Sequence, residues 1–128
     1  MSTLEKTAAR VLQEFSKISS AWIFGSHARN QARPDSDVDL AILVTAPLST
    51  DELVRLSGRL SWELSEDRVD LVVLNSALPI LCFEAISGIN ILCKDDAFQA
   101  EFFSLTCRQY EEDMAMWERG LAYRREAS

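Results

Sequence analysis

The spacing of hydrophobic residues along the chain predicts an alternation of helices and strands. The stretch Ser2-Thr3-Leu4-Glu5 fits a capping box, and apolar residues follow it at helical spacing, which predicts a helix over residues 3–18. A second capping box, Ser49-Thr50-Asp51-Glu52, is followed by leucines at helical spacing and predicts a second long helix. Short apolar runs predict strands at residues 21–24, 38–44, 68–74 and 89–93.

Two further helices complete the predicted element order. Residues 79–86, closed by Gly88, predict a short helix, and the pattern is helical again from residue 96 to about residue 125. The chain contains no internal repeat, low-complexity tract or linker, so a single α/β domain over residues 1–128 is the simplest architecture.

Composition narrows the class of protein. The 128 residues carry a net charge of -7, which disfavours direct, extended binding to nucleic acid and suits a basic partner or divalent cations. No apolar run reaches the roughly 18 residues that a membrane span needs, and a signal-peptide profile is absent. Three widely spaced cysteines in apolar contexts fit buried thiols better than disulfides or a zinc site, so we expect a cytoplasmic protein.

Acidic residues gather at the start of two predicted strands. Asp37 and Asp39 are two residues apart, so their side chains project from the same face, and Asp70 lies one residue inside the next strand. If these strands are neighbours, one register brings the three carboxylates together. The alternative is that Asp35 and Asp37 are turn residues after Pro34, and that Asp39 and Asp70 are solvated edge-strand charges.

The apolar surroundings of Asp39 and Asp70 favour a metal site. Both lie in runs of Val, Leu and Ile that are typical of strands hidden from water, where an unpaired carboxylate is costly. Two carboxylates about 4 Å apart repel by roughly 4 kcal/mol at an effective dielectric constant near 20. They would share a proton, pair with cations or bind a metal, and oxygen ligands without His or Cys suit Mg²⁺ or Mn²⁺.

A glycine–serine pair ends the first predicted strand. Gly25 and Ser26 would present backbone N–H groups and a hydroxyl to a phosphate, and residues 27–32 could open a short helix. Arg29 could pair with a triphosphate, or it could balance nearby aspartates together with Arg33. His27, the only histidine, could contact a phosphate or simply face solvent or pack against a helix.

Together these residues form the pattern G-S-x10-D-x-D, with Asp70 in the place of a third carboxylate. The chain therefore resembles the DNA polymerase β-like nucleotidyltransferase superfamily, and its F-G-S-x-A-R stretch and small size make it similar to the minimal nucleotidyltransferases. Many of these are antitoxins paired with HEPN-domain toxins, which are RNases. The sequence departs from many members at His27, where Arg is common, and at Asn30, where Gly is common.

The resemblance implies a nucleotidyltransferase fold, in which helices flank a short mixed sheet, and a site for Mg²⁺ and ATP. It implies that Asp37 and Asp39 hold the metals, that Asp70 completes the second metal site and helps to deprotonate the acceptor, and that Gly25 and Ser26 contact the terminal phosphates. Members paired with HEPN toxins are implied to transfer AMP from ATP to a toxin tyrosine, within a hetero-oligomer.

Two other functions stay open at the level of sequence. The C-terminal segment carries more apolar residues than one core-facing stripe needs, so Trp117 and Tyr123 could dock a partner. An antitoxin could then neutralise its toxin by binding alone. Transfer to a small hydroxylated molecule is a further alternative, although 128 residues leave little room for a substrate-binding domain.

Overall fold

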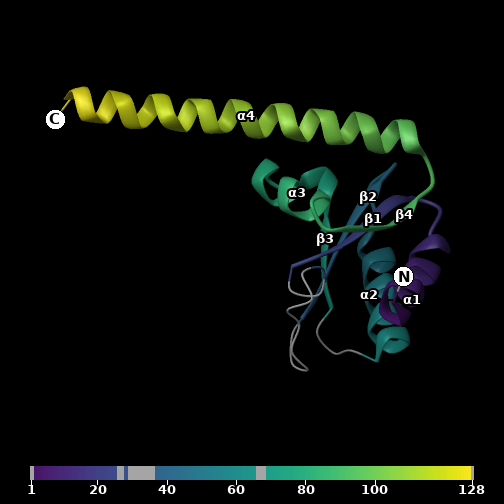
Figure 1. The fold of residues 1–128 in the computed structure, drawn as a ribbon. Coiled ribbons are helices and arrows are strands. Elements are labelled where there is room, and N and C mark those ends of the chain that lie inside the picture. The colour runs from purple at the N-terminus through teal and green to yellow at the C-terminus, as the bar shows by residue number, and fades with distance from the viewer. Residues whose placement is uncertain (1, 26–27, 29–36, 66–68, 128) are drawn as a thin grey trace.

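The computed structural model describes residues 2–25, 28, 37–65 and 69–127. Figure 1 shows a sheet between helices, and a long C-terminal helix that extends well past the rest of the molecule. The elements, in chain order, are α1 (Thr3–Gln13), β1 (Ile18–Phe24), β2 (Val38–Val44), α2 (Thr50–Leu64), β3 (Val69–Val73), the 3-10 turn η1 (Leu74–Ser76), α3 (Pro79–Ile86), β4 (Ile89–Cys93) and α4 (Asp96–Ala127).

The first helix is shorter than the sequence pattern predicts. It ends at Gln13, and Ile18, which fits the helical spacing, instead begins β1 and pairs with Val44. Ile18 is fully buried at that position. Isoleucine and serine are poorer helix formers than alanine or leucine, and pairing with β2 buries Ile18, so tertiary contacts override the local periodicity. The capping boxes predicted at Ser2 and Ser49 are both present.

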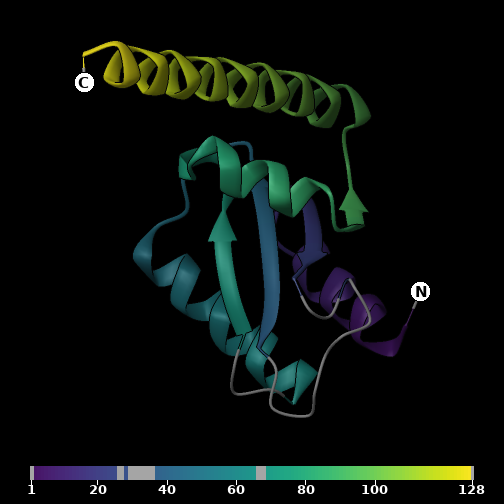
Figure 2. The same ribbon diagram turned by 60° about the vertical axis from the view of Figure 1, so that its left-hand side comes forward.

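The sheet is mixed, as the family resemblance implies. Its strand order is β3-β2-β1-β4; β2 pairs with β3 in parallel, whereas β1 pairs with β2 and with β4 in antiparallel. In Figures 1 and 2, α1 and α2 cover one face of the sheet, and α3 lies on the opposite face with α4 beyond it.

Alternation along the strands divides the core between these two faces. Leu40 and Ile42 pack in the cluster that includes Leu56 and Leu60 of α2, whereas Ala41 and Leu43 pack in the cluster that contains α3 residues. The face of β2 opposite to α1 and α2 is therefore the one on which Asp39 lies. In the described part of the chain, no helix combines the length and apolarity required to cross a membrane.

Candidate active site

The parallel pairing of β2 and β3 positions the acidic residues. Asp39 and Asp70 are direct partners in this register, so their side chains project from the same face of the sheet on adjacent strands. Asp37 is the residue immediately before β2, two positions from Asp39. The register thus brings positions 39 and 70 together at the N-terminal ends of two neighbouring strands, and Asp37 directly precedes one of these ends.

The apolar surroundings of Asp39 and Asp70 in the sequence predict burial, and this prediction is wrong for Asp70. Asp39 is half-buried, but Asp37 and Asp70 are exposed, because β3 is an edge strand and its start is open to solvent. Burial therefore cannot be what makes the Asp70 carboxylate costly. Asp39 is not isolated, since it takes part in a polar interaction.

Two features allow the aspartates to bind a divalent metal ion: the pairing of their strands and the oxygen atoms of their carboxylates. As their side chains stand, no three His, Cys, Asp or Glu residues of the described chain converge closely enough to hold a metal ion. Exposed carboxylates can change rotamer at little cost, and the strands holding Asp39 and Asp70 are about 4.8 Å apart, as in any sheet. Oxygen donors at adjacent positions fit Mg²⁺ or Mn²⁺.

Gly25 lies against the Asp39 carboxylate. Its φ is +74°, in the left-handed region that favours glycine, and an added Cβ would clash with Asp39 Oδ2 and lie 3.3 Å from Asp39 Cγ. Two independent constraints therefore require glycine here. Ser26, His27, Arg29, Arg33 and Asp35 lie outside the described residues, so their proposed roles stay predictions.

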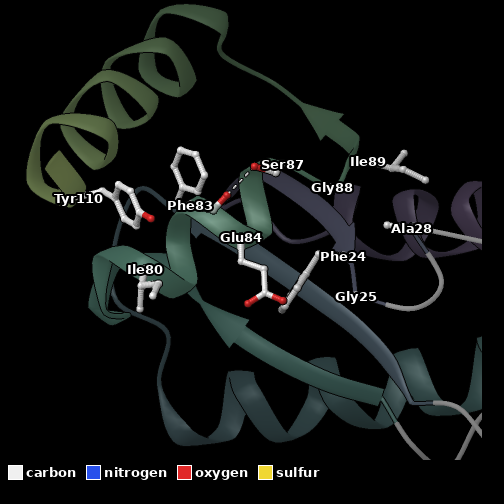
Figure 3. Close-up of a pocket in the computed structure, with 10 residues that line it drawn as sticks. All are labelled: Phe24, Gly25, Ala28, Ile80, Phe83, Glu84, Ser87, Gly88, Ile89 and Tyr110. Atoms are coloured by element: carbon white, nitrogen blue, oxygen red, sulfur yellow. Dashed lines mark hydrogen bonds between the residues drawn. The ribbon is translucent and has the colours of Figure 1, made fainter. Parts of the chain in front are cut away.

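A cavity of about 420 Å³, which we call the α3 pocket, opens next to these residues. Phe24 forms part of its wall and is the direct β1 partner of Asp39, so the pocket and the acidic residues are adjacent on one face of the sheet. Figure 3 shows the carboxylate of Glu84 extending from α3 toward Phe24. The lining residues are Phe24, Gly25, Ala28, Ile80, Phe83, Glu84, Ser87, Gly88, Ile89 and Tyr110.

Close backbone packing shapes the floor of the α3 pocket. An added Cβ at Gly88 would clash with the backbone carbonyl of Ile23 and lie 3.0 Å from Phe24 Cα, so glycine allows the start of β4 to approach β1. This pocket was not predicted from the sequence. A signal for it exists in the sequence, because Glu84 is the one charged residue in the otherwise apolar segment 79–86.

A second cavity, the apolar groove, lies between α3 and α4. It measures about 430 Å³ and is lined by Leu78, Pro79, Ile80, Tyr110, Asp113, Met114 and Trp117. The Tyr110 ring stacks on Phe83 with centroids 4.8 Å apart and joins the two helices. Trp117, predicted to dock a partner, is 61% exposed, whereas Tyr123 lies where the structure describes no side chains.

Several basic side chains of the described chain are paired away from this site. Arg10 and Arg59 of α1 and α2 contact Glu63 and Glu14 at 3.0 and 2.7 Å, and Lys17 contacts Glu52 at 2.7 Å. The hydrogen bond from Lys17, assisted by bonds from the Ser49 backbone and hydroxyl, lowers the pKa of Glu52 to about 2. These pairs join α1, α2 and the loop before β1, so they serve the fold.

Comparison with known proteins identifies the family. A family profile described as "Polymerase beta, Nucleotidyltransferase" matches residues 6–97. The chain belongs to this nucleotidyltransferase family. The matched segment includes all four strands, α3 and the three aspartates, and ends just after α4 begins.

Relatives within the family point to one activity. "Putative protein adenylyltransferase MJ0126" of Methanocaldococcus jannaschii is 43% identical over 65 residues, which cover 51% of this nucleotidyltransferase and 65% of that protein. "Protein adenylyltransferase MntA" of Shewanella oneidensis is 32% identical over 71 residues, covering 56% of this chain and 50% of that protein. The matches therefore span between half and two thirds of these relatives' lengths.

A solved structure resembles almost the whole nucleotidyltransferase. The "Crystal structure of the toxin-antitoxin with AMP-PNP" contains a chain with a TM-score of 0.78 and 25% identity. The similarity covers 97% of this chain and 98% of that one, so it includes the long α4 helix.

Proposed function

We propose that this nucleotidyltransferase is an Mg²⁺-dependent protein adenylyltransferase, which transfers AMP from ATP to a tyrosine hydroxyl of a HEPN-domain toxin and acts as its antitoxin. One observation carries the proposal: the direct pairing of Asp39 with Asp70, with Asp37 just before β2 and Gly25 against Asp39. The names of the relatives and of the structural neighbour support the protein acceptor and the nucleotide.

Each residue has a distinct task in this proposal. Asp37, Asp39 and Asp70 would hold two divalent ions, which when bound would stabilise the entering and leaving oxygens. Asp70 would also take the proton of the acceptor hydroxyl, whose oxygen attacks the α-phosphorus while the bond to the β-phosphate oxygen breaks and pyrophosphate leaves. Gly25 and Ser26 would contact the terminal phosphates through backbone N–H groups and a hydroxyl, with Arg29 as a further phosphate contact.

Radiolabelled ATP tests the transfer directly. The purified nucleotidyltransferase is incubated with ATP labelled at the α-phosphate, magnesium and a cognate HEPN-domain protein, and label is expected on the partner. Asp37→Asn and Asp39→Asn should each abolish the labelling, while Asp51→Asn, an exposed aspartate on α2, should leave it intact. Labelling that persists in both site variants would exclude the role proposed for these carboxylates.

Neutralisation by binding alone is the second candidate function, and the apolar groove favours it. Leu78 and Ile80 line the groove together with Trp117, and they are 72% and 62% exposed. This is an unusual amount of exposed apolar surface for one small region. We propose that the toxin docks here whether or not AMP is transferred. Trp117→Ala should weaken toxin binding in calorimetry, with exposed Trp62→Ala on α2 as the matched control.

A toxicity assay separates the two candidates. If Asp39→Asn still protects cells that express the toxin, binding alone suffices for neutralisation. If only the wild-type chain protects, the transfer of AMP is required.

A further inference from the structure

Glu84 is placed in the α3 pocket without a visible structural task. The structure gives its carboxylate no hydrogen bond or ion pair within the described residues, and Figure 3 shows it pointing from α3 toward Phe24. The rest of the lining is mostly apolar or aromatic. A lone carboxylate among such groups is suited to accept hydrogen bonds from a ligand, which fits the usual composition of binding pockets.

Charge decides which part of a nucleotide could lie beside Glu84. The carboxylate would repel a polyphosphate, so the pocket suits the uncharged nucleoside end. The position of Phe24 fits the same order, because it is the β1 partner of Asp39 and the Glu84 carboxylate extends toward it in Figure 3. A nucleotide with its α-phosphate at the aspartates would therefore bring its sugar to the pocket first.

The far part of the α3 pocket suits a base. Phe83 and Tyr110 stack on each other there, and Ile80 adds an aliphatic surface. Flat apolar rings bind such surfaces well. The donors that come nearest to Glu84 are then the 2′ and 3′ hydroxyls of the ribose, and one carboxylate can accept both hydrogen bonds.

We propose that Glu84 binds the ribose 2′ and 3′ hydroxyls of the nucleotide and makes this site selective for ribonucleotides over deoxyribonucleotides. The proposal rests on the function proposed above, and it adds a specificity-determining residue to that site. Glu84 holds no metal in this assignment and takes no part in the transfer of a proton.

Binding measured without an acceptor tests the role of Glu84. Calorimetric titration of the full chain with ATP and with 2′-deoxy-ATP, in magnesium, should give roughly 10- to 100-fold tighter binding of ATP, as expected for a hydrogen bond to a charged group. In Glu84→Ala the two affinities should agree within about twofold, because ATP loses the hydrogen bonds of both hydroxyls whereas 2′-deoxy-ATP has only that of its 3′ hydroxyl to lose. Glu101→Ala, an exposed glutamate of α4 outside the pocket, should keep the wild-type ratio.

Other outcomes would overturn the assignment. An unchanged ratio in Glu84→Ala, or an equal loss for both nucleotides, would show that Glu84 does not bind the 2′ hydroxyl. If Glu84→Ala lost affinity for GTP but not for ATP, the carboxylate would contact the base and not the ribose. Thermal unfolding checks that Glu84→Ala and the isosteric Glu84→Gln both fold. If only Glu84→Ala fails to fold, Glu84→Gln replaces it, and an unchanged ratio of ATP affinity to 2′-deoxy-ATP affinity in that variant overturns the assignment.

The two proposals can fail separately. Ribose selectivity without AMP transfer to any HEPN-domain protein would refute the proposed function and leave the role of Glu84 standing. AMP transfer that uses ATP and 2′-deoxy-ATP equally well would refute the role of Glu84 and leave the proposed function standing. A chain that binds neither nucleotide would overturn both.

Discussion

Substitution of Gly25 should damage stability and activity through two separate effects. Alanine at φ +74° costs about 1–2 kcal/mol, because its Cβ crowds the backbone in the left-handed region. The same Cβ would clash with Asp39 Oδ2, so the carboxylate must leave its rotamer or the strand end must shift, at a further cost of about 0.5–1.5 kcal/mol. We therefore expect Gly25→Ala to lower the free energy of unfolding by roughly 2–3 kcal/mol.

Transfer of AMP should fall by more than the loss of stability explains. A displacement of Asp39 by about 1 Å would cost on the order of 100-fold in kcat/KM. Urea unfolding gives the stability, and incorporation of α-labelled AMP into the partner gives the rate, measured well below the melting temperature. Because domains are typically stable by 5–15 kcal/mol, Gly25→Ala should remain folded under these conditions.

Gly58→Ala is the matched control. Gly58 lies inside α2, and nothing lies within 4 Å of an added Cβ. Alanine should therefore stabilise the helix by about 0.5–1 kcal/mol and leave transfer unchanged. If Gly25→Ala transfers AMP as fast as Gly58→Ala, the contact between Gly25 and Asp39 has no part in the reaction.

Three further predictions concern the stability of the fold. Asn75 Oδ1 accepts a hydrogen bond from Val44 N at 2.9 Å and its Nδ2 donates to Val44 O at 2.8 Å, so Asn75→Ala should cost about 1–3 kcal/mol in urea unfolding, against little change for Ser76→Ala. The pKa of Glu52 is lowered to about 2, so its ion pair with Lys17 stabilises the fold fully above the unfolded pKa near 4.5. This contribution is lost as the pH falls from 4.5 toward 2. The difference in melting temperature between wild type and Glu52→Gln should therefore shrink over this pH range. Leu60 is fully buried, and Leu60→Ala should cost about 2–5 kcal/mol while the rate of AMP transfer by the folded protein stays unchanged; a slower folded enzyme would show that the two faces of the sheet are coupled.

The sequence predicts most of the elements because hydrophobic periodicity and caps act locally. Both capping boxes, the short helix at 79–86 and the strand at 89–93 are confirmed. The predicted first helix is too long because hydrophobic periodicity is a local signal. It cannot reveal the pairing of Ile18 with Val44, a contact between residues far apart in the chain. Strand order is equally non-local, and only the structure shows that β2 has β3 as its parallel neighbour.

The candidate site was predicted less completely than the fold. The spacing of the aspartates already places Asp37 and Asp39 on one face, but no local rule gives the exposure of Asp70 on an edge strand. The contact of Gly25 with Asp39 depends on a tertiary approach, as does the α3 pocket. Glu84 was not predicted because it is exposed, as most glutamates on helices are, and only the tertiary pocket beside it distinguishes it from them.

The charge balance of the chain explains why a nucleotide site of this kind would need divalent cations. The protein has a net charge of -7, Asp39 and Asp70 are paired on adjacent strands, and Asp37 directly precedes β2, so a triphosphate would approach a region that is already negative. Within the described residues, Arg10 and Arg59 are committed to glutamates that join α1 to α2. Neutralisation by Arg29 alone could not offset several phosphate charges and three carboxylates together. Divalent ions bound between the phosphate oxygens and the carboxylate oxygens would convert that repulsion into attraction. The acidic surface elsewhere would still repel nucleic acid as a competing substrate.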